Sequence, residues 1–246
     1  MHDLREQGNS TLTKPLRLAE HEVHLWRARL DVQADTVDRL SSYLASDEKQ
    51  RASRFRFAND ANRFIVARGI LRELAGAYLR RPPAALCFVN GPFGKPALQP
   101  DPVAPDLRFN LAHSDEFAVY AFTLAREVGI DVERVRPEAI LHGMEKHHFS
   151  AREQHELLRL SDELRPEGFF LCWTRKEAYV KARGEGLYVP LSSFDVSLTP
   201  GRAAVLNSED QERWTMRSFS PAEDFVGALV IEGHGSHVEF RDWPAA

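Results

Sequence analysis

A succession of sequence features that occurs twice constrains the fold of this chain more than any other property. Val23–Ala28 alternates apolar and polar residues with the period of a half-buried strand, and Val128–Glu133 alternates in the same way 105 residues later. Ser150–Glu153 is predicted to open a helix with a capping box, in which the Ser oxygen and the Glu carboxylate accept from free backbone N–H groups. Ser46–Lys49 stands at the matching place 104 residues earlier.

The longer elements repeat in the same order. In the first half, a long helix and two adjacent strands are predicted at Asn59–Leu79, Leu107–Leu111 and Glu116–Leu124, and in the second half at Gly168–Arg183, Trp214–Phe219 and Asp224–Ile231. We therefore expect an α+β fold of two similar halves, each with a small antiparallel sheet and a long helix, related by a pseudo-twofold axis. A single α+β domain with coincidental echoes is the alternative.

The boundary between the halves is expected near Arg126. This divides the chain into a loose polar tail at residues 1–18, a first half at 19–126 and a second half at 127–246. A crevice between two related halves is a favoured place for a ligand.

The segment Phe169–Gly186 contains no Gly or Pro until Gly184, which ends a predicted helix. Trp173, Glu177 and Lys181 recur every four residues and therefore lie on one side of that helix. A carboxylate and an ammonium one turn apart suit either a surface ion pair or a reaction site.

Asp131 and Glu133 share one face of a predicted strand, with apolar neighbours on the core-facing side. Two carboxylates this close need a cation, a proton or exposure to water. Oxygen ligands at this spacing suit Mg²⁺ together with substrate phosphates, although an exposed strand edge carries the same pattern. With Glu177 as a third carboxylate and Lys181 as a nearby cation, the set is suited to holding a pyrophosphate and stabilising its leaving oxygen.

The net charge is −4, so the overall charge does not indicate a nucleic-acid partner, and no motif for reading RNA or DNA stands out. Between Lys49 and Arg81, however, the sequence contains nine basic and two acidic residues, which gives a local net charge of +7. Such a stretch suits phosphate groups or an acidic protein surface, and a solvated helix face is the alternative. Phe55 and Phe57 in the same stretch are expected in the core.

Cys87 and Cys172 lie in apolar runs without metal-ligand spacing, so we expect buried thiols in a reduced compartment and a cytoplasmic protein. No apolar run approaches the length of a membrane span, and Met1–Lys14 lacks the apolar centre of a signal peptide. No membrane partner is expected.

Four motifs follow one another along the chain, at Gly94–Pro96, Phe109–Ser114, Gly129–Glu133 and Phe170–Lys181. In this order and at these separations they resemble the motifs of Sfp-type 4′-phosphopantetheinyl transferases. The resemblance extends from about Leu44 to Leu191. It implies the fold of that family, in its two-half monomeric type.

The resemblance also implies an activity. The family transfers the 4′-phosphopantetheine arm of coenzyme A, in the presence of Mg²⁺, to a serine hydroxyl of an apo acyl- or peptidyl-carrier protein. The other product is adenosine 3′,5′-bisphosphate. Such carriers are generally acidic around the modified serine, and a basic approach surface would speed the encounter.

Individual residues receive roles from the same resemblance. Asp131, Glu133 and Glu177 match the Mg²⁺ ligands, and Glu177 would also help to remove the serine proton. Lys181 matches the basic residue that faces the pyrophosphate. The positions that match coenzyme A contacts are Lys49, Arg63, Gly94, Lys95, Pro96, Ala112 and His113.

Two positions depart from the family pattern. Ala112 stands where a serine is usual, so a hydroxyl donor to phosphate is absent, although the backbone N–H of Ala112 remains. Ala52 stands where a second lysine is usual, and Arg51 or Arg54 would have to supply that contact. Two other interpretations stay open: a Mg²⁺-dependent nucleotide phosphohydrolase, and a non-catalytic module that binds coenzyme A or a carrier protein.

Overall fold

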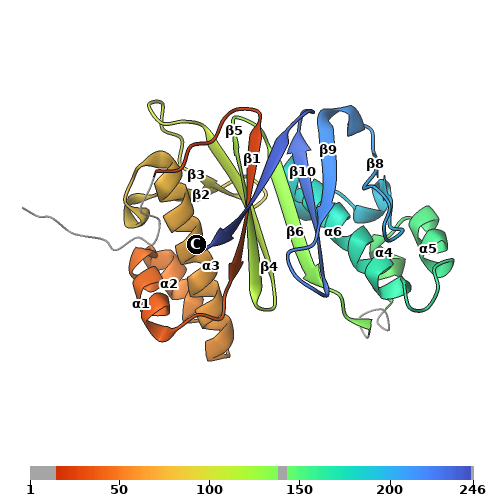
Figure 1. Cartoon of the computed structure of the whole chain (residues 1–246), viewed down its shortest axis with the longest axis horizontal. Coiled ribbons are helices and arrows are strands. Elements are labelled where there is room, and N and C mark those ends of the chain that lie inside the picture. The colour runs from red at the N-terminus through yellow and green to blue at the C-terminus, as the bar shows by residue number, and fades with distance from the viewer. Residues whose placement is uncertain (1–14, 138–142, 245–246) are drawn as a thin grey trace, which may run out of the picture.

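The structure, a computed structural model, describes residues 15–137 and 143–244. Two β-sheets lie face to face at the centre, and helices cover the outer face of each sheet (Figure 1). The first sheet contains β1 (Glu22–Arg29), β4 (Leu107–Ser114), β5 (Phe117–Leu124) and β11 (His237–Trp243), in the order β11-β1-β5-β4. The second contains β6 (Val128–Arg134), β9 (Trp214–Phe219) and β10 (Phe225–Glu232), in the order β6-β10-β9.

The outer layers are helical. Helices α1 (Ala34–Tyr43), α2 (Ser46–Ala52) and α3 (Ala58–Leu79) belong to the first half, and α4 (Glu145–His148), α5 (Ala151–Leu158) and α6 (Arg165–Arg183) to the second. Each half adds a short hairpin, β2 (Phe88–Asn90) with β3 (Pro96–Leu98) and β7 (Asp195–Val196) with β8 (Leu206–Asn207). Single 3₁₀ turns lie at Pro83–Ala85, Gly186–Tyr188, Leu191–Ser193 and Gln211–Arg213.

The same strand order occurs in both halves, which confirms the predicted α+β fold of two similar halves. The order β1-β5-β4 of the first sheet matches β6-β10-β9 of the second, and all the neighbouring strands in these two sets are antiparallel. In both halves, the long helix lies between the first strand and the other two in the sequence. The capping box is complete only in the second half, where Glu153 accepts from the N–H of Ser150 and the Ser150 hydroxyl accepts from the N–H of Glu153. In the first half Glu48 accepts from the N–H of Ala45, which has no side-chain oxygen to complete the box.

Three clusters of buried residues hold the layers together. Strand β5 shows the arrangement, because Val119 and Ala121 face the second sheet while Tyr120 and Phe122 face helix α3. Strand β1 is also covered on both faces, so the prediction of a half-buried strand there was wrong. A sheet that packs against helices on one side and another sheet on the other leaves few positions for water.

The ends of the described chain belong to the first half. Strand β11 pairs in parallel with β1, so the last strand joins the first sheet although it follows the second half. Of the predicted tail at residues 1–18, residues 1–14 lie outside the described residues. Leu16 and Leu18 pack against the core beside α3. The proposed division at residues 126 and 127 stays a prediction.

Two expectations about side-chain burial were wrong. Phe55 and Phe57, on the loop between α2 and α3, are 39% and 60% exposed. Cys172 is buried, but Cys87 is exposed. Among the residues that the structure describes, no helix combines the length and the apolar character needed to cross a membrane.

Candidate active site at the seam between the halves

Strands β4 and β6 are the edge strands at which the two sheets meet, and we call their adjacent edges the seam (Figure 1). They belong to different sheets, and side chains join them. Asn110 of β4 is buried, and its Oδ1 accepts from the backbone N–H of Ile130 on β6 at 2.9 Å. A buried amide that accepts from the backbone of the other half fixes the register between the halves.

Helix α6 lies directly on β6 at Gly129. A Cβ atom at Gly129 would lie 2.0 Å from the carbonyl oxygen of Ala178 and 2.3 Å from the N atom of Ala182. Only glycine permits this approach. Residues 129, 131 and 133 share one face of the strand. Because Gly129 contacts α6, the side chains of Asp131 and Glu133 emerge on the α6 side.

One side of α6 is only partly covered by the rest of the protein. From Gly168 to Ala182 every residue is buried except Trp173, Glu177 and Lys181, which are half-buried. These are the three residues that the four-residue spacing placed together. The helix then ends at Gly184, which adopts the left-handed conformation with φ 72°.

Asp131 and Lys181 form an ion pair across the contact between β6 and α6. The Lys181 Nζ atom lies 2.6 Å from Oδ1 of Asp131. Oδ2 of Asp131 is buried and has no hydrogen-bond partner among the described residues. Burial raises the pKa of Asp131 against the pull of the Lys181 charge. Burial lowers the pKa of Lys181, but the charge and hydrogen bond of Asp131, together with the charges of Glu177 and Glu133, outweigh burial and raise this pKa overall.

Glu133 is tied to the first half. The hydroxyl of Ser114, the last residue of β4, donates to Oε2 of Glu133 at 2.8 Å. Burial and then the Asp131 charge raise the pKa of Glu133 to about 7. A carboxyl group in this state readily accepts a cation in place of a proton.

Glu177 completes the group from the helix. Within the described part of the chain its carboxylate makes no hydrogen bond. Burial raises the pKa of Glu177, the Lys181 charge opposes this, and the Asp131 charge adds to it. The three predicted carboxylates therefore interact electrostatically around one ammonium group, that of Lys181.

The chemistry of these donors fits a hard cation. Asp131 keeps a buried oxygen without a donor, Glu133 keeps Oε1 free of hydrogen bonds to the described residues, and Glu177 keeps both of its oxygens. Mg²⁺ prefers such oxygens together with phosphate and water. No three His, Cys, Asp or Glu side chains of the described residues are already gathered as a metal cage. A cation would therefore need ligands from a bound phosphate or a change in side-chain rotamers.

His113 and two arginines lie on the first-half side of this group. Protein atoms around the ring, followed by the Lys181 charge, lower the pKa of His113, although the residue is exposed. Arg51 and Arg63 act on His113 in the same direction. The basic stretch thus comes close to the carboxylates in space. Lys49 and Arg51 form no ion pair within the described residues.

Arg63 is engaged within the protein. Its guanidinium donates to both carboxylate oxygens of Asp31, at 2.8 and 2.9 Å. This exposed bidentate pair raises the pKa of Arg63 and lowers that of Asp31. A phosphate at Arg63 would have to displace Asp31 or share the guanidinium with it.

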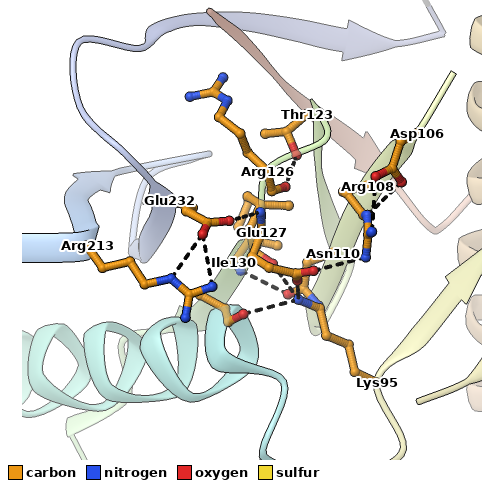
Figure 2. A network of polar contacts seen from close by, with 12 residues as sticks. Lys95, Asp106, Arg108, Asn110, Thr123, Arg126, Glu127, Ile130, Arg213 and Glu232 are labelled. Carbon is orange, nitrogen blue, oxygen red and sulfur yellow. Dashed lines mark hydrogen bonds and ion pairs between the residues drawn. The ribbon is translucent and has the colours of Figure 1, made fainter. Parts of the chain in front are cut away.

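Lys95 points into the protein at the junction of the halves. Its ammonium donates to Glu127 Oε2 at 2.7 Å, a contact that can be followed in Figure 2, and to the carbonyl of Val128 at 3.0 Å. The carbonyl of Ala182, in the last turn of α6, lies 3.4 Å away. Burial lowers the pKa of Lys95 against the pull of Glu127. In this conformation the side chain holds the end of α6.

The backbone around Lys95 suits a close ligand. Gly94 has φ 86° and no atom within 4 Å of the place where a Cβ would lie, so this turn is open. Pro96 begins β3. Ala112 lies on β4, and its side chain is buried in the core between the sheets, so only its backbone is available for a contact.

Ser114 and Asn110 were not among the site residues predicted from the sequence. Both lie in a motif that was singled out, but their partners, Glu133 and Ile130, are about 20 residues away on the other half. The pairing follows only from the meeting of β4 and β6. Alternation along β4 carried a weak signal, since Asn110 and Ser114 occupy the same face as Ala112.

Two family models together match most of the chain. The model described as "4′-phosphopantetheinyl transferase, N-terminal" matches residues 31–124, and that described as "4′-phosphopantetheinyl transferase superfamily" matches residues 127–230. A relative from Nostoc sp., "4′-phosphopantetheinyl transferase HetI", is 38% identical over 231 residues, which cover 93% of this chain and 96% of that protein. "4′-Phosphopantetheinyl transferase Sfp" from Bacillus subtilis is 29% identical over 161 residues, covering 65% of this chain and 69% of that one.

Among solved structures, a holo-(acyl-carrier-protein) synthase from Bacillus anthracis in complex with CoA (3′,5′-ADP) is similar to part of the chain. It is 21% identical with a TM-score of 0.37, and the match covers 44% of this chain and 96% of that one.

Proposed function

The chain belongs to the 4′-phosphopantetheinyl transferase family, and from this premise we propose that it transfers the phosphopantetheine arm of coenzyme A to a serine of an apo acyl- or peptidyl-carrier protein. The second product is adenosine 3′,5′-bisphosphate. One observation carries the proposal: Asp131 and Glu133 from β6 face Glu177 and Lys181 from α6 at the seam.

Binding comes first in the proposed reaction. Asp131, Glu133 and Glu177 would hold Mg²⁺, and when bound this ion would neutralise charge on the diphosphate. His113, Arg63 and the other residues implied by the resemblance would contact coenzyme A. Those residues are Lys49, Gly94, Lys95, Pro96 and the backbone of Ala112.

The chain's own residues then direct the transfer. The carrier serine oxygen forms a bond to the phosphorus next to pantetheine, while the bond from that phosphorus to the bridging oxygen breaks. The serine proton passes to the carboxylate of Glu177, directly or through a bound water. The bridging oxygen leaves with adenosine 3′,5′-bisphosphate and carries the electron pair, and the Lys181 ammonium stabilises its developing charge.

We also propose that the carrier is acidic where it docks and that the chain acts as a monomer. Lys49 and Arg51, which form no ion pair with the described residues, support the first proposal, since opposite charge speeds encounter. The second is supported by the two halves of one chain, which supply both sides of the seam.

The test is transfer itself. The chain is incubated with coenzyme A, Mg²⁺ and a small panel of apo carrier proteins, and intact masses are measured. The proposal predicts a gain of one phosphopantetheine group on at least one carrier, none when EDTA is present, and none on a carrier whose serine is replaced by alanine. Phosphate release from a nucleotide without a carrier would favour a phosphohydrolase. Coenzyme A binding without transfer to any carrier would favour a binding module.

A further inference from the structure

The hydroxyl of Ser114 is held on both sides. It donates to Oε2 of Glu133 at 2.8 Å and accepts from the backbone N–H of Arg134 at 3.2 Å. Ser114 is 8% exposed and is the last residue of β4. A two-residue turn follows, in which Asp115 has φ 49°, and Ser114 pairs with Phe117 on the other side of the turn. The strand register and the turn therefore fix the position of the hydroxyl.

Ser114 acts on Glu133 as Lys181 acts on Asp131. Lys181 holds Oδ1 of Asp131 from the helix, and Ser114 holds Oε2 of Glu133 from the opposite strand. Each carboxylate is anchored through one oxygen and keeps the other without a hydrogen bond to the described residues. Outer partners that anchor ligating carboxylates in this way contribute to metal affinity.

We propose that Ser114 is a positioning residue, which holds Glu133 in the orientation that binds the divalent cation. The inference rests on the proposed function, because it takes Glu133 as a metal ligand. Ser114 touches neither substrate nor cation and acts through Glu133. Since Ser114 belongs to β4 and Glu133 to β6, the hydrogen bond links cation affinity to the docking of the two halves.

A purely structural hydroxyl would behave differently. If the hydrogen bond only stabilised the seam, its loss would lower the melting temperature and leave cation affinity unchanged. If the hydrogen bond positions Glu133, its loss lowers the affinity for the divalent cation while the protein stays folded.

The test uses Mn²⁺ as a probe for the cation. Mn²⁺ is titrated into the full chain with saturating coenzyme A, and free Mn²⁺ is followed by electron paramagnetic resonance. Removing a residue that anchors a metal ligand typically lowers metal affinity tenfold or more. We therefore expect the dissociation constant for Mn²⁺ to be about tenfold larger in Ser114→Ala. Ser114→Thr keeps the hydroxyl and should bind within about twofold of the unmodified chain. Ser114→Cys, nearly the same size but a weak donor, should behave like alanine and replaces it if the alanine variant does not fold.

Ser218→Ala is the matched control. It removes the hydroxyl of β9 that accepts from Arg175, two strands away from β6. Its cation affinity should be unchanged. In transfer assays, Ser114→Ala should raise the Mg²⁺ concentration for half-maximal rate and leave the rate at saturating Mg²⁺ near normal.

The outcomes separate the two levels of inference. An unmodified chain that binds no Mn²⁺ with coenzyme A overturns the metal site of the proposed function, and with it the role of Ser114. An unmodified chain that binds Mn²⁺, with Ser114→Ala or Ser114→Cys equal to it, overturns the role of Ser114 alone. Equal weakening in Ser114→Thr and Ser114→Ala also overturns it, because the hydroxyl would then not be the cause.

Discussion

The Nζ atom of Lys181 lies 2.6 Å from Oδ1 of Asp131, and the other oxygen of the same carboxylate is buried without a hydrogen bond from the described residues. Helix α6 and strand β6 are so close at Gly129 that this pair is held with little freedom. The contact joins the predicted catalytic helix to the predicted metal-binding strand. The Lys181 ammonium neutralises one of the three negative charges of Asp131, Glu133 and Glu177. It leaves the buried Oδ2 of Asp131 available to a cation.

Replacing Lys181 by methionine removes the partner of a buried carboxylate. We expect a loss of about 2 kcal/mol in the free energy of unfolding, less than for a fully buried pair because 30% of the Lys181 side chain is exposed. Transfer should fall by about a hundredfold or more, since a charge that stabilises the leaving oxygen is missing. Lys181→Arg, which keeps the charge, should retain more stability and more transfer activity than Lys181→Met. Full transfer by Lys181→Met would exclude this role.

Gly129→Ala tests the closeness of the helix and the strand. A Cβ atom there would lie 2.0 Å from backbone that cannot move without shifting α6, so we expect a loss of about 3 kcal/mol or more and of most transfer activity. Gly201→Ala is the control, at φ 72° with no atom within 4 Å, and should cost only about 1 kcal/mol. Urea unfolding of the two variants checks the difference, and equal stabilities would contradict the account.

Lys95 separates a structural role from a ligand-binding role. Lys95→Met removes a donor from Glu127, which keeps Arg108, and from two carbonyl oxygens, so we expect about 2 kcal/mol lower stability. Arg108→Met, which removes an exposed partner of the same Glu127, should cost less than about 1 kcal/mol. Denaturant unfolding and coenzyme A titration are run on both. Weaker coenzyme A binding with unchanged stability would instead support the contact that the resemblance implies.

His24 predicts a pH dependence away from the site. It is fully buried, with Nδ1 2.7 Å from the hydroxyl of Tyr78, and burial followed by the Arg241 charge lowers its pKa from 6.5 to about 4 despite the neighbouring carboxylates Glu22 and Glu239. Below pH 6.5 the unfolded chain binds a proton that the folded chain excludes. Stability should therefore fall as the pH drops from about 6.5 to about 4, by about 3 kcal/mol in total.

His24→Gln should flatten this part of the stability curve, even if it also lowers stability overall. Chemical denaturation at several pH values between 4 and 7 measures the slope. An unchanged slope in the variant would assign the dependence to other groups.

The spacing of residues along the sequence predicted which side chains share one face of a helix or strand, because local backbone geometry determines this. The four-residue spacing of Trp173, Glu177 and Lys181 placed them on one side of α6, and the alternation at Asp131 and Glu133 placed both carboxylates on one face of β6. The repeated order of features predicted two similar halves, because each half has to form its own sheet and cover it with a helix.

Contacts between the halves were not predictable in this way. The bond from Ser114 to Glu133, the inward course of Lys95 and the pairing of β11 with β1 depend on which edges meet in space. Exposure of Phe55 and Phe57 was missed because apolar character alone does not tell a core residue from one on a surface loop.

The central claim is that Glu177, with Asp131 and Glu133, is required for transfer of the phosphopantetheine arm from coenzyme A. The most direct measurement is intact-mass analysis of an apo carrier protein incubated with coenzyme A, Mg²⁺ and either the unmodified chain or Glu177→Gln, with coenzyme A binding measured in parallel. The account predicts a gain of one phosphopantetheine group with the unmodified chain, and almost none with the variant although it still binds coenzyme A. Equal transfer by both would contradict it.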